Sequence, residues 1–430
     1  MNSILLIDFG ASRVKTALLR QGELTDIQSR ASVFPCNTEN GKYETDVFAI
    51  KDIFLSLVKS YSANTKLSGI FICSEMHGFA LLDNNNAPVS NYVSWKDERC
   101  LNEIDGISSF DLLKKNLGNS FFEKTGMNLR PCYPIFNVFH MARSKEISSA
   151  KIVSLPEWLC CCGGKSLNVS HCTMSAGLGF YNIYENIFDK DLINSAAKNN
   201  INLSFNRPSK EVEAGGYIEI DGKDIPIFTG VGDHQCAVLG AGNDKNSISV
   251  NLGTGSQVAI INLANANCEK RPFFNDQLLS VITHIPSGRA LNVYVNFLKS
   301  INPNIDFWQK LSGVSIEDIK KAALKINLAV FESAWNYDSG GSISAIGENN
   351  FNLNDYLASL LKEYAEQYAK AIYNLKPPKN FNKIILSGGI GAKLPAVGKY
   401  LNVLTGFPVS ITDSAYDETI AGLKIIADNV

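Results

Sequence analysis

The sequence predicts an α/β protein of two domains. Apolar strand-like runs alternate with amphipathic helix-like runs, which is the pattern of a sheet covered by helices. A chain of 430 residues is too long for one hydrophobic core, so we expect it to divide. Residues 248–261 also repeat the order of residue types in residues 5–18: strand, polar residue, apolar residue, glycine, small residues, strand. This repeat favours two related domains.

The individual elements follow from local patterns. Prolines after Leu375 end the longest amphipathic run, and the turn-forming segment at 241–246 marks a domain boundary. We therefore expect domains at residues 1–242 and 243–430. The elements expected in chain order are strand–turn–strand at 4–24, a helix at 52–63, a strand at 67–75, helices at 110–118, 137–150 and 186–200, strand–turn–strand at 248–261, a helix at 354–375, and strand–turn–helix at 381–395.

Composition excludes several classes of partner. The net charge is −2 and no block of like charges occurs, so neither nucleic acid nor an anionic membrane surface is an expected partner. The N-terminal apolar run is too short for a signal peptide, and no apolar stretch is long enough to span a bilayer. Ten irregularly spaced cysteines favour reduced thiols, and hence a cytoplasmic protein. The oligomeric state stays open, a homodimer included.

Three glycine turns directly follow apolar strands, in the segments DFGAS, NLGTGS and LSGGIGAK. The backbone N–H groups of such turns can converge on one point and bind an anion. The spacing matches neither a P-loop nor a dinucleotide fingerprint, so a nucleotide held between two domains is the better interpretation. Ordinary hairpin turns are the alternative.

Two aspartates are candidates for chemistry. Asp8 ends a buried strand, where a carboxylate needs a partner. A hydrated Mg²⁺ carried by nucleotide phosphates is one such partner, and capping of the turn is the alternative. Asp233 lies in GVGDHQCAVLGAG, just before an apolar helix start. There it fits a general base, or else the N-cap of that helix.

Cysteine and histidine side chains raise two competing hypotheses. Cys236 follows His234 by two residues at a helix start, so the two side chains point to different faces, which argues against a Cys/His nucleophile. The segment EWLCCCGGKSLNVSHC concentrates soft metal ligands, but in adjacent positions rather than the C-x₂-C spacing typical of zinc. Packing of small buried side chains is the preferred interpretation of both groups.

Taken together, these segments resemble the FGGY family of carbohydrate kinases, within the actin-like ATPase superfamily. DFGASRVKTALL resembles the first phosphate motif, with Ala11 at a usual threonine, and ISVNLGTGSQV resembles the second. CSEMHGFALLD and SWKDERC resemble sugar-contact segments of xylulokinases, with Glu75 at a usual glutamine. GVGDHQCAVLGAG resembles the stretch that carries the catalytic aspartate, and IILSGGIGAKLP resembles the adenosine motif.

The resemblance implies two actin-like (ribonuclease H-like) domains, with ATP, Mg²⁺ and a small sugar bound in the cleft between them. It implies that Asp233 is the catalytic base and that Asp8 holds magnesium. The residues expected to contact the nucleotide are Gly10, Ser12, Lys15, Gly253, Thr254, Gly255, Gly388, Gly389 and Gly391. The residues expected to contact the sugar are Glu75, Met76, His77, Trp95, Asp97, Asp233 and His234.

The function implied is MgATP-dependent phosphorylation of a terminal hydroxyl of a ketose, with xylulose first and sedoheptulose next. Departures from the family pattern, Glu75 and the missing Lys-x-x-Trp segment among them, leave the sugar open. A catalytically impaired sugar- or nucleotide-binding protein on the same fold is the alternative. A chaperone-type ATPase explains the phosphate turns but not SEMHGF or SWKDERC.

Overall fold

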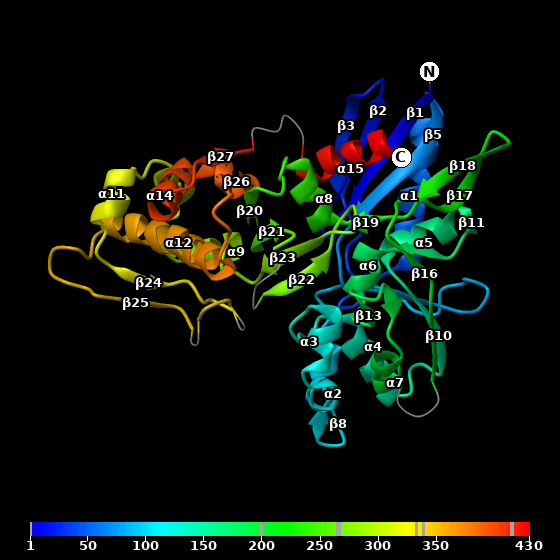
Figure 1. The fold of residues 1–430 in the computed structure, drawn as a ribbon. Coiled ribbons are helices and arrows are strands. Elements are labelled where there is room, and N and C mark those ends of the chain that lie inside the picture. Colours follow the sequence, from blue (N-terminus) through cyan, green and yellow to red (C-terminus); the bar gives the residue numbers. More distant parts are fainter. Residues whose placement is uncertain are drawn as a thin grey trace. The chain divides into compact units, whose positions relative to one another are not determined.

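The computed structural model describes residues 2–197, 201–253, 255–263, 268–331, 334–337, 340–412 and 417–430. The chain forms two compact units (Figure 1): Met1–Gly240 with Lys270–Gln277 and Tyr416–Val430, and Ala241–Glu269 with Leu278–Ala415. The first boundary lies two residues from the predicted one. Two later segments, Lys270–Gln277 and Tyr416–Val430, fall within the predicted second domain (243–430) but pack in the first unit.

The first unit is built on a large mixed sheet whose strand order is β11-β17-β18-β5-β1-β2-β3, with β19 also paired to β5. β1 and β19 both run parallel to β5, whereas β1 and β2 form the predicted hairpin. The side chains of Leu5, Leu6 and Ile7 are all fully buried, as expected for a central strand. The bounds are β1 (Asn2–Phe9), β2 (Arg13–Arg20), β3 (Glu23–Ala31), β5 (Lys66–Ser74), β11 (Gly164–Ser166), β17 (Ala214–Ile220), β18 (Lys223–Phe228) and β19 (Val231–Gly232).

Among the helices that pack near this sheet are α1 (Val47–Ser62), α5 (Leu155–Cys162), α8 (Asp233–Gly240) and α15 (Glu418–Asn429). α1 begins where the Asp46 side chain accepts the Phe48 N–H, and it buries Ile50, Phe54 and Tyr61. α15, red in Figure 1, lies beside α8. The C-terminal helix therefore belongs to the N-terminal unit.

A second hydrophobic core in this unit is centred on Phe121, Phe136 and Phe139, which are all fully buried. The elements outside the main sheet are β4 (Glu44–Thr45), β6 (Ala80–Leu82), β7 (Tyr92–Val93), η1 (Arg99–Leu101), β8 (Glu103–Ile104), β9 (Ile107–Ser108), α2 (Ser109–Leu117), α3 (Ser120–Thr125), α4 (Pro134–Arg143), β10 (Ser149–Val153), β12 (Val169–His171), α6 (Cys172–Gly177), β13 (Tyr181–Asn182), β14 (Ile187–Phe188), α7 (Lys190–Ala196), β15 (Asn202–Phe205) and β16 (Arg207–Ser209).

The second unit repeats the arrangement of the first on a smaller scale, with strand order β23-β21-β20-β26-β27. β20 and β21 form the second predicted hairpin, and β20 runs parallel to β26 as β1 does to β5. The strands are β20 (Ser247–Leu252), β21 (Ser256–Ile261), β23 (Leu278–Ile282), β24 (Lys325–Asn327), β25 (Ser342–Ser344), β26 (Lys383–Ser387) and β27 (Val409–Ile411), and β22 (Glu269–Pro272) spans the boundary.

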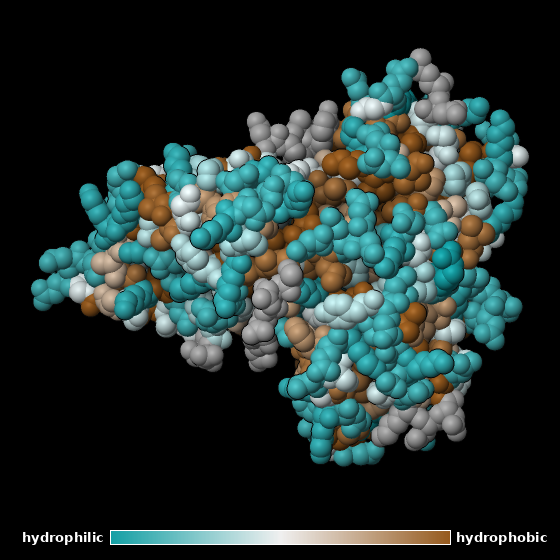
Figure 2. All heavy atoms as spheres, viewed as in Figure 1, coloured by the Kyte–Doolittle hydropathy of each residue, from teal (hydrophilic) through white to brown (hydrophobic). Residues whose placement is uncertain are grey.

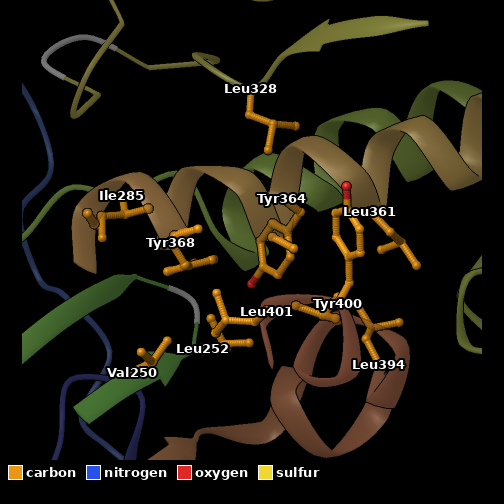
Figure 3. Packing of buried hydrophobic residues seen from close by; sticks show 14 of the residues in the cluster. Val250, Leu252, Ile285, Leu328, Leu361, Tyr364, Tyr368, Leu394, Tyr400 and Leu401 are labelled. Atoms are coloured by element: carbon orange, nitrogen blue, oxygen red, sulfur yellow. The ribbon is translucent and has the colours of Figure 1, made fainter. Parts of the chain in front are cut away.

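The predicted long helix is α12 (Leu353–Leu375), one residue longer than expected at its start. Its buried side chains, Leu361, Tyr364 and Tyr368 among them, pack toward Leu252 and Leu401 (Figure 3). Polar side chains cover much of the surface in view, interspersed with smaller apolar areas (Figure 2). The other helices are α9 (Gly288–Ile301), α10 (Phe307–Ser312), α11 (Ile316–Lys321), α13 (Gly389–Lys393) and α14 (Pro395–Thr405).

Two predicted helices are shorter than expected. The helix at 137–150 ends at Arg143, because Lys145 adopts a left-handed backbone conformation and Ser149 already begins β10. The helix at 186–200 begins only at Lys190, capped by Asp189, since residues 187–188 pair with β13. Residues 198–200 lie outside the described part of the chain. The α/β class itself is confirmed.

Candidate active site

Three acidic residues lie at one edge of the first unit's sheet. Asp8 is near the end of β1, Glu75 directly follows β5, and Asp233 directly follows β19. Ser74 pairs with Phe9 on one side and with Gly232 on the other, so the carboxyl ends of the three parallel strands are level. The carboxyl edge of parallel strands is where ligands bind in α/β proteins. The sheet thus brings together the predicted base, the predicted metal ligand and Glu75.

Asp233 starts α8 and its carboxyl is surrounded by other charged groups. Its Oδ1 accepts the N–H of His234 at 2.7 Å. Burial, followed by the negative charge of Asp8, raises the pKa of Asp233 to about 7, although Arg271 and Lys15 oppose the shift. A carboxyl whose pKa lies near neutrality is suited to exchange a proton with a hydroxyl.

Asp8 is held by a network that also contains the start of α15. Lys15, its cross-strand partner, donates to Asp8 Oδ2 at 3.0 Å and to Asp417 at 2.8 Å. Thr419 donates to the same Asp8 oxygen at 2.7 Å. Burial would lower the pKa of Lys15, but Asp8 and Asp417 raise it above its usual value. Lys15 is therefore a half-buried cation beside the first glycine turn. The sequence patterns did not predict its partner Asp417, which lies 402 residues away along the chain.

The first glycine turn is tight and its tip is exposed. Gly10 donates its N–H to the Arg13 carbonyl at 3.1 Å, and the Ser12 carbonyl accepts the N–H of Ser32 at 3.1 Å. Ala11 and Ser12 are exposed, so their backbone is accessible to a ligand. Contacts of Gly10 and Ser12 with a nucleotide stay predictions.

Met76 and His77 lie next to this edge. Met76 is buried, and a side chain added at Gly232 would stand 2.9 Å from its sulfur, so the strand before Asp233 touches it directly. His77 has a left-handed backbone, and its Nδ1–H donates to the Gly177 carbonyl at 2.9 Å. The His77 ring lies 4.7 Å from the ring of Tyr133. This wall of planar and apolar groups is typical of a sugar site.

Trp95 and Asp97 take different positions although both were predicted to contact the sugar. Trp95 is 41% exposed, whereas Asp97 is completely buried. Both oxygens of Asp97 accept hydrogen bonds from Arg99, at 2.8 and 2.7 Å, and one also accepts the Tyr43 N–H. Asp97 thus lies in an internal ion pair, and its contact with a sugar stays a prediction.

His234 and Gln235 are buried behind Asp233. Neither ring nitrogen of His234 has a hydrogen-bond partner among the described residues, and burial together with Arg271 lowers its pKa well below the usual value, so the ring is neutral. Gln235 donates to the Pro272 carbonyl at 3.2 Å. That carbonyl belongs to the returning segment 270–277, which also brings Arg271 into the site. No sequence motif signalled this arginine.

The glycine turns of the second unit lie together at the carboxyl edge of β20 and β26. Asn251 pairs with Ser387 across these strands and donates to its hydroxyl at 3.3 Å. Gly388 has φ +87°, and a side chain there would meet the Leu252 carbonyl at 2.6 Å, so only glycine fits. Gly255 and Gly389 have open space where a side chain would be, and Gly391 packs on Leu386. Gly253 accepts the Gly288 N–H, and Thr254 lies outside the described residues.

The cysteine-rich segment has hydrogen-bond and packing partners of its own. Cys160 is fully buried against the backbone of β17, and His171 donates through Nε2 to the Lys210 carbonyl at 3.2 Å. Across the described ranges, no cluster of three or more His, Cys, Asp or Glu side chains is arranged to hold a metal ion. The same ranges contain no helix that is both long and apolar enough to cross a membrane.

Comparison with known proteins places this geometry in context. Residues 3–240 match the model of the FGGY family of carbohydrate kinases, N-terminal domain. The chain is 28% identical over 130 residues to a xylulose kinase of Staphylococcus xylosus, a match covering 29% of this chain and 26% of that protein. It is 22% identical over 428 residues to the xylulose kinase of Lactococcus lactis, covering 92% and 82%.

A solved structure shows the same fold. The gluconate kinase of Lactobacillus acidophilus superposes with a TM-score of 0.81 at 18% identity, covering all of this chain and 89% of that one. The expected two-domain kinase fold is confirmed by this likeness. The relatives differ in the sugar that they are named for.

Proposed function

Because the chain belongs to the FGGY family of carbohydrate kinases, we propose that it transfers the γ-phosphate of ATP to a terminal hydroxyl of a small ketose, with Asp233 as the general base. Xylulose is the first candidate, in keeping with the named relatives, and sedoheptulose is the second. The observation that carries the proposal is the position of Asp233, at the edge shared with Asp8 and beside Met76.

The proposed chemistry divides between positioning and proton transfer. Met76, His77 and Trp95 hold the sugar, and Asp233 takes the proton of the attacking hydroxyl. Gly253, Gly255, Gly388, Gly389 and Gly391 approach the nucleotide with their backbone. Gly388 admits no side chain, and the open space at Gly255 and Gly389 leaves their backbone accessible to a ligand. His234, buried and neutral, directly follows the base in α8 and is a further candidate for contact with the sugar.

Magnesium fits the residues present. The bonds from Lys15 and Thr419 both end on Oδ2 of Asp8 and do not use Oδ1, so Asp8 is the residue that would hold a hydrated ion. Magnesium carried by phosphates needs only one or two protein carboxylates, so a larger ligand cluster is not required. When bound, it would neutralise charge on the transferred phosphoryl group.

A coupled assay of ADP release tests the proposal. We expect ATP turnover to depend on a ketose from a panel of ketoses, aldoses and polyols, and to fall to background when Asp233 is replaced by alanine. If no sugar raised ADP release above the background of Asp233→Ala, the kinase function would be contradicted and the impaired binding protein favoured. Turnover that needs no sugar would instead favour a chaperone-like ATPase.

The activity should depend on the protonation of Asp233. Its pKa is raised to about 7, so its carboxyl is mostly protonated, and unable to accept a proton, below that pH. We expect kcat/KM for the sugar to rise as the pH increases through about 7 and then to level off. Initial rates at subsaturating sugar in a series of buffers measure this limb. A rate that does not change across this pH would contradict the assignment.

A further inference from the structure

Glu75 is a buried acid that has only part of its hydrogen-bonding capacity satisfied. It is 6% exposed, and its Oε1 accepts the hydroxyl of Tyr92 at 2.9 Å. Its Oε2 is enclosed and accepts no hydrogen bond of normal geometry from the described residues. A buried carboxylate oxygen without a donor is costly, so this oxygen is suited to receive a donor from a ligand.

The surroundings of Glu75 connect it to the candidate active site. Its backbone N–H approaches the carbonyl of Phe9 at 3.5 Å, so it lies against the first glycine turn. A cavity of about 30 Å³, roomy enough for a hydroxyl group or a water molecule, is lined here by Gly10, Ala11, Ser32, Glu75, Tyr92 and Ser94. The tight packing under this site is set by Gly78, where any side chain would overlap the Tyr92 hydroxyl.

The hydrogen bonds that Oε2 can accept then decide which phosphoryl-acceptor molecule suits this position. A sugar hydroxyl can donate to Oε2, whereas a carboxylate has no hydrogen to donate and carries a like charge. Building on the proposed kinase function, we infer that Glu75 is a specificity-determining residue that selects neutral polyhydroxy acceptors over acceptors bearing a carboxylate. Among kinases of this fold, this chain would then differ from one named for gluconate.

The selection should vary with pH in a predictable direction. Burial raises the pKa of Glu75 to about 7, Asp233 adds to the shift, and Tyr92, Lys96 and Trp95 oppose it. Below that pH the carboxyl is protonated and can donate a hydrogen bond to an anionic acceptor. Above it, the carboxylate repels the anion. Discrimination against the anion therefore increases as the pH rises through about 7.

The experiment compares two acceptors that differ only in one terminal group, xylitol and xylonate. For the wild type, we expect the ratio of kcat/KM values to favour xylitol, and to grow by about tenfold as the pH rises through the titration of Glu75. In Glu75→Gln the ratio should be smaller and independent of pH. Because Asp233 acts on both acceptors, its titration cancels in the ratio.

Tyr92→Phe provides a second variant that keeps the carboxylate. Loss of the Tyr92 hydrogen bond should raise the pKa of Glu75 further and move the change in the ratio to higher pH. A ratio unaffected by Glu75→Gln, or a wild type that prefers xylonate, would overturn the inference while leaving the kinase function intact. Should no acceptor be phosphorylated, calorimetry still measures the ratio of the dissociation constants of xylitol and xylonate, which Glu75 should shift in the same direction. The two proposals therefore fail separately.

Discussion

Asp233→Asn should lower kcat for sugar phosphorylation by a factor of about 10² to 10⁴, the usual contribution of a general base. Asparagine has the same shape, and its oxygen can still accept the His234 N–H that Asp233 accepts at 2.7 Å. It cannot accept the proton of the attacking hydroxyl. Single-turnover and steady-state rates of ADP and sugar-phosphate formation measure the loss, and calorimetry should show sugar binding largely retained.

Asp189→Asn is the matched control, because it also changes an aspartate at a helix start. Asp189 caps α7 by accepting the N–H groups of Asp191 and Leu192 and pairs with Lys124, and it is not among the residues of the candidate site. This variant should lose some stability but keep its kcat. If Asp233→Asn behaved in the same way, Asp233 would be a structural residue of α8 and not the base.

Local patterns were enough to predict the elements that depend on neighbouring residues. The apolar spacing from Leu357 to Leu375 predicted α12 almost to the residue, because a long helix with one buried face has a clear period. The glycine turns were equally visible. Gly388, for example, has a positive φ and a carbonyl 2.6 Å from where its side chain would be.

Contacts between distant segments could not be predicted from the sequence patterns. Nothing in the sequence around Arg271 signals that residues 270–277 return to the first unit, since the contacts that hold them, such as Gln235 with Pro272, have no local period. Two further contacts could not be predicted from local patterns either: the ion pair of Lys15 with Asp417, and the burial of Asp97 against Arg99. The strand ends that bring Asp8, Glu75 and Asp233 together likewise depend on pairing across the sheet.

Gly422→Ala should strongly destabilise the first unit, because α8 and α15 approach each other through glycines. A side chain at Gly422 would lie 2.0 Å from the Cys236 carbonyl oxygen, and one at Gly240 would lie 1.9 Å from the Glu418 carbonyl oxygen. Both obstacles are backbone atoms, so a helix must move. We expect a loss of about 3 kcal/mol in the free energy of unfolding, at the upper end for overpacking, which corresponds to a midpoint lower by roughly 6–12 °C.

The displacement should also reach the active site, because α8 begins at Asp233 and Asp417 at the start of α15 binds Lys15. Thermal unfolding and kcat therefore fall together in Gly422→Ala. Gly398→Ala is the control: Gly398 also lies within a helix, α14, but the nearest atoms stand 3.4 to 4.0 Å from its added carbon. There alanine fits and favours the helix by up to about 1 kcal/mol. Equal unfolding midpoints in the two variants would show that α8 and α15 can separate without cost, and that the glycine contact does not position the base.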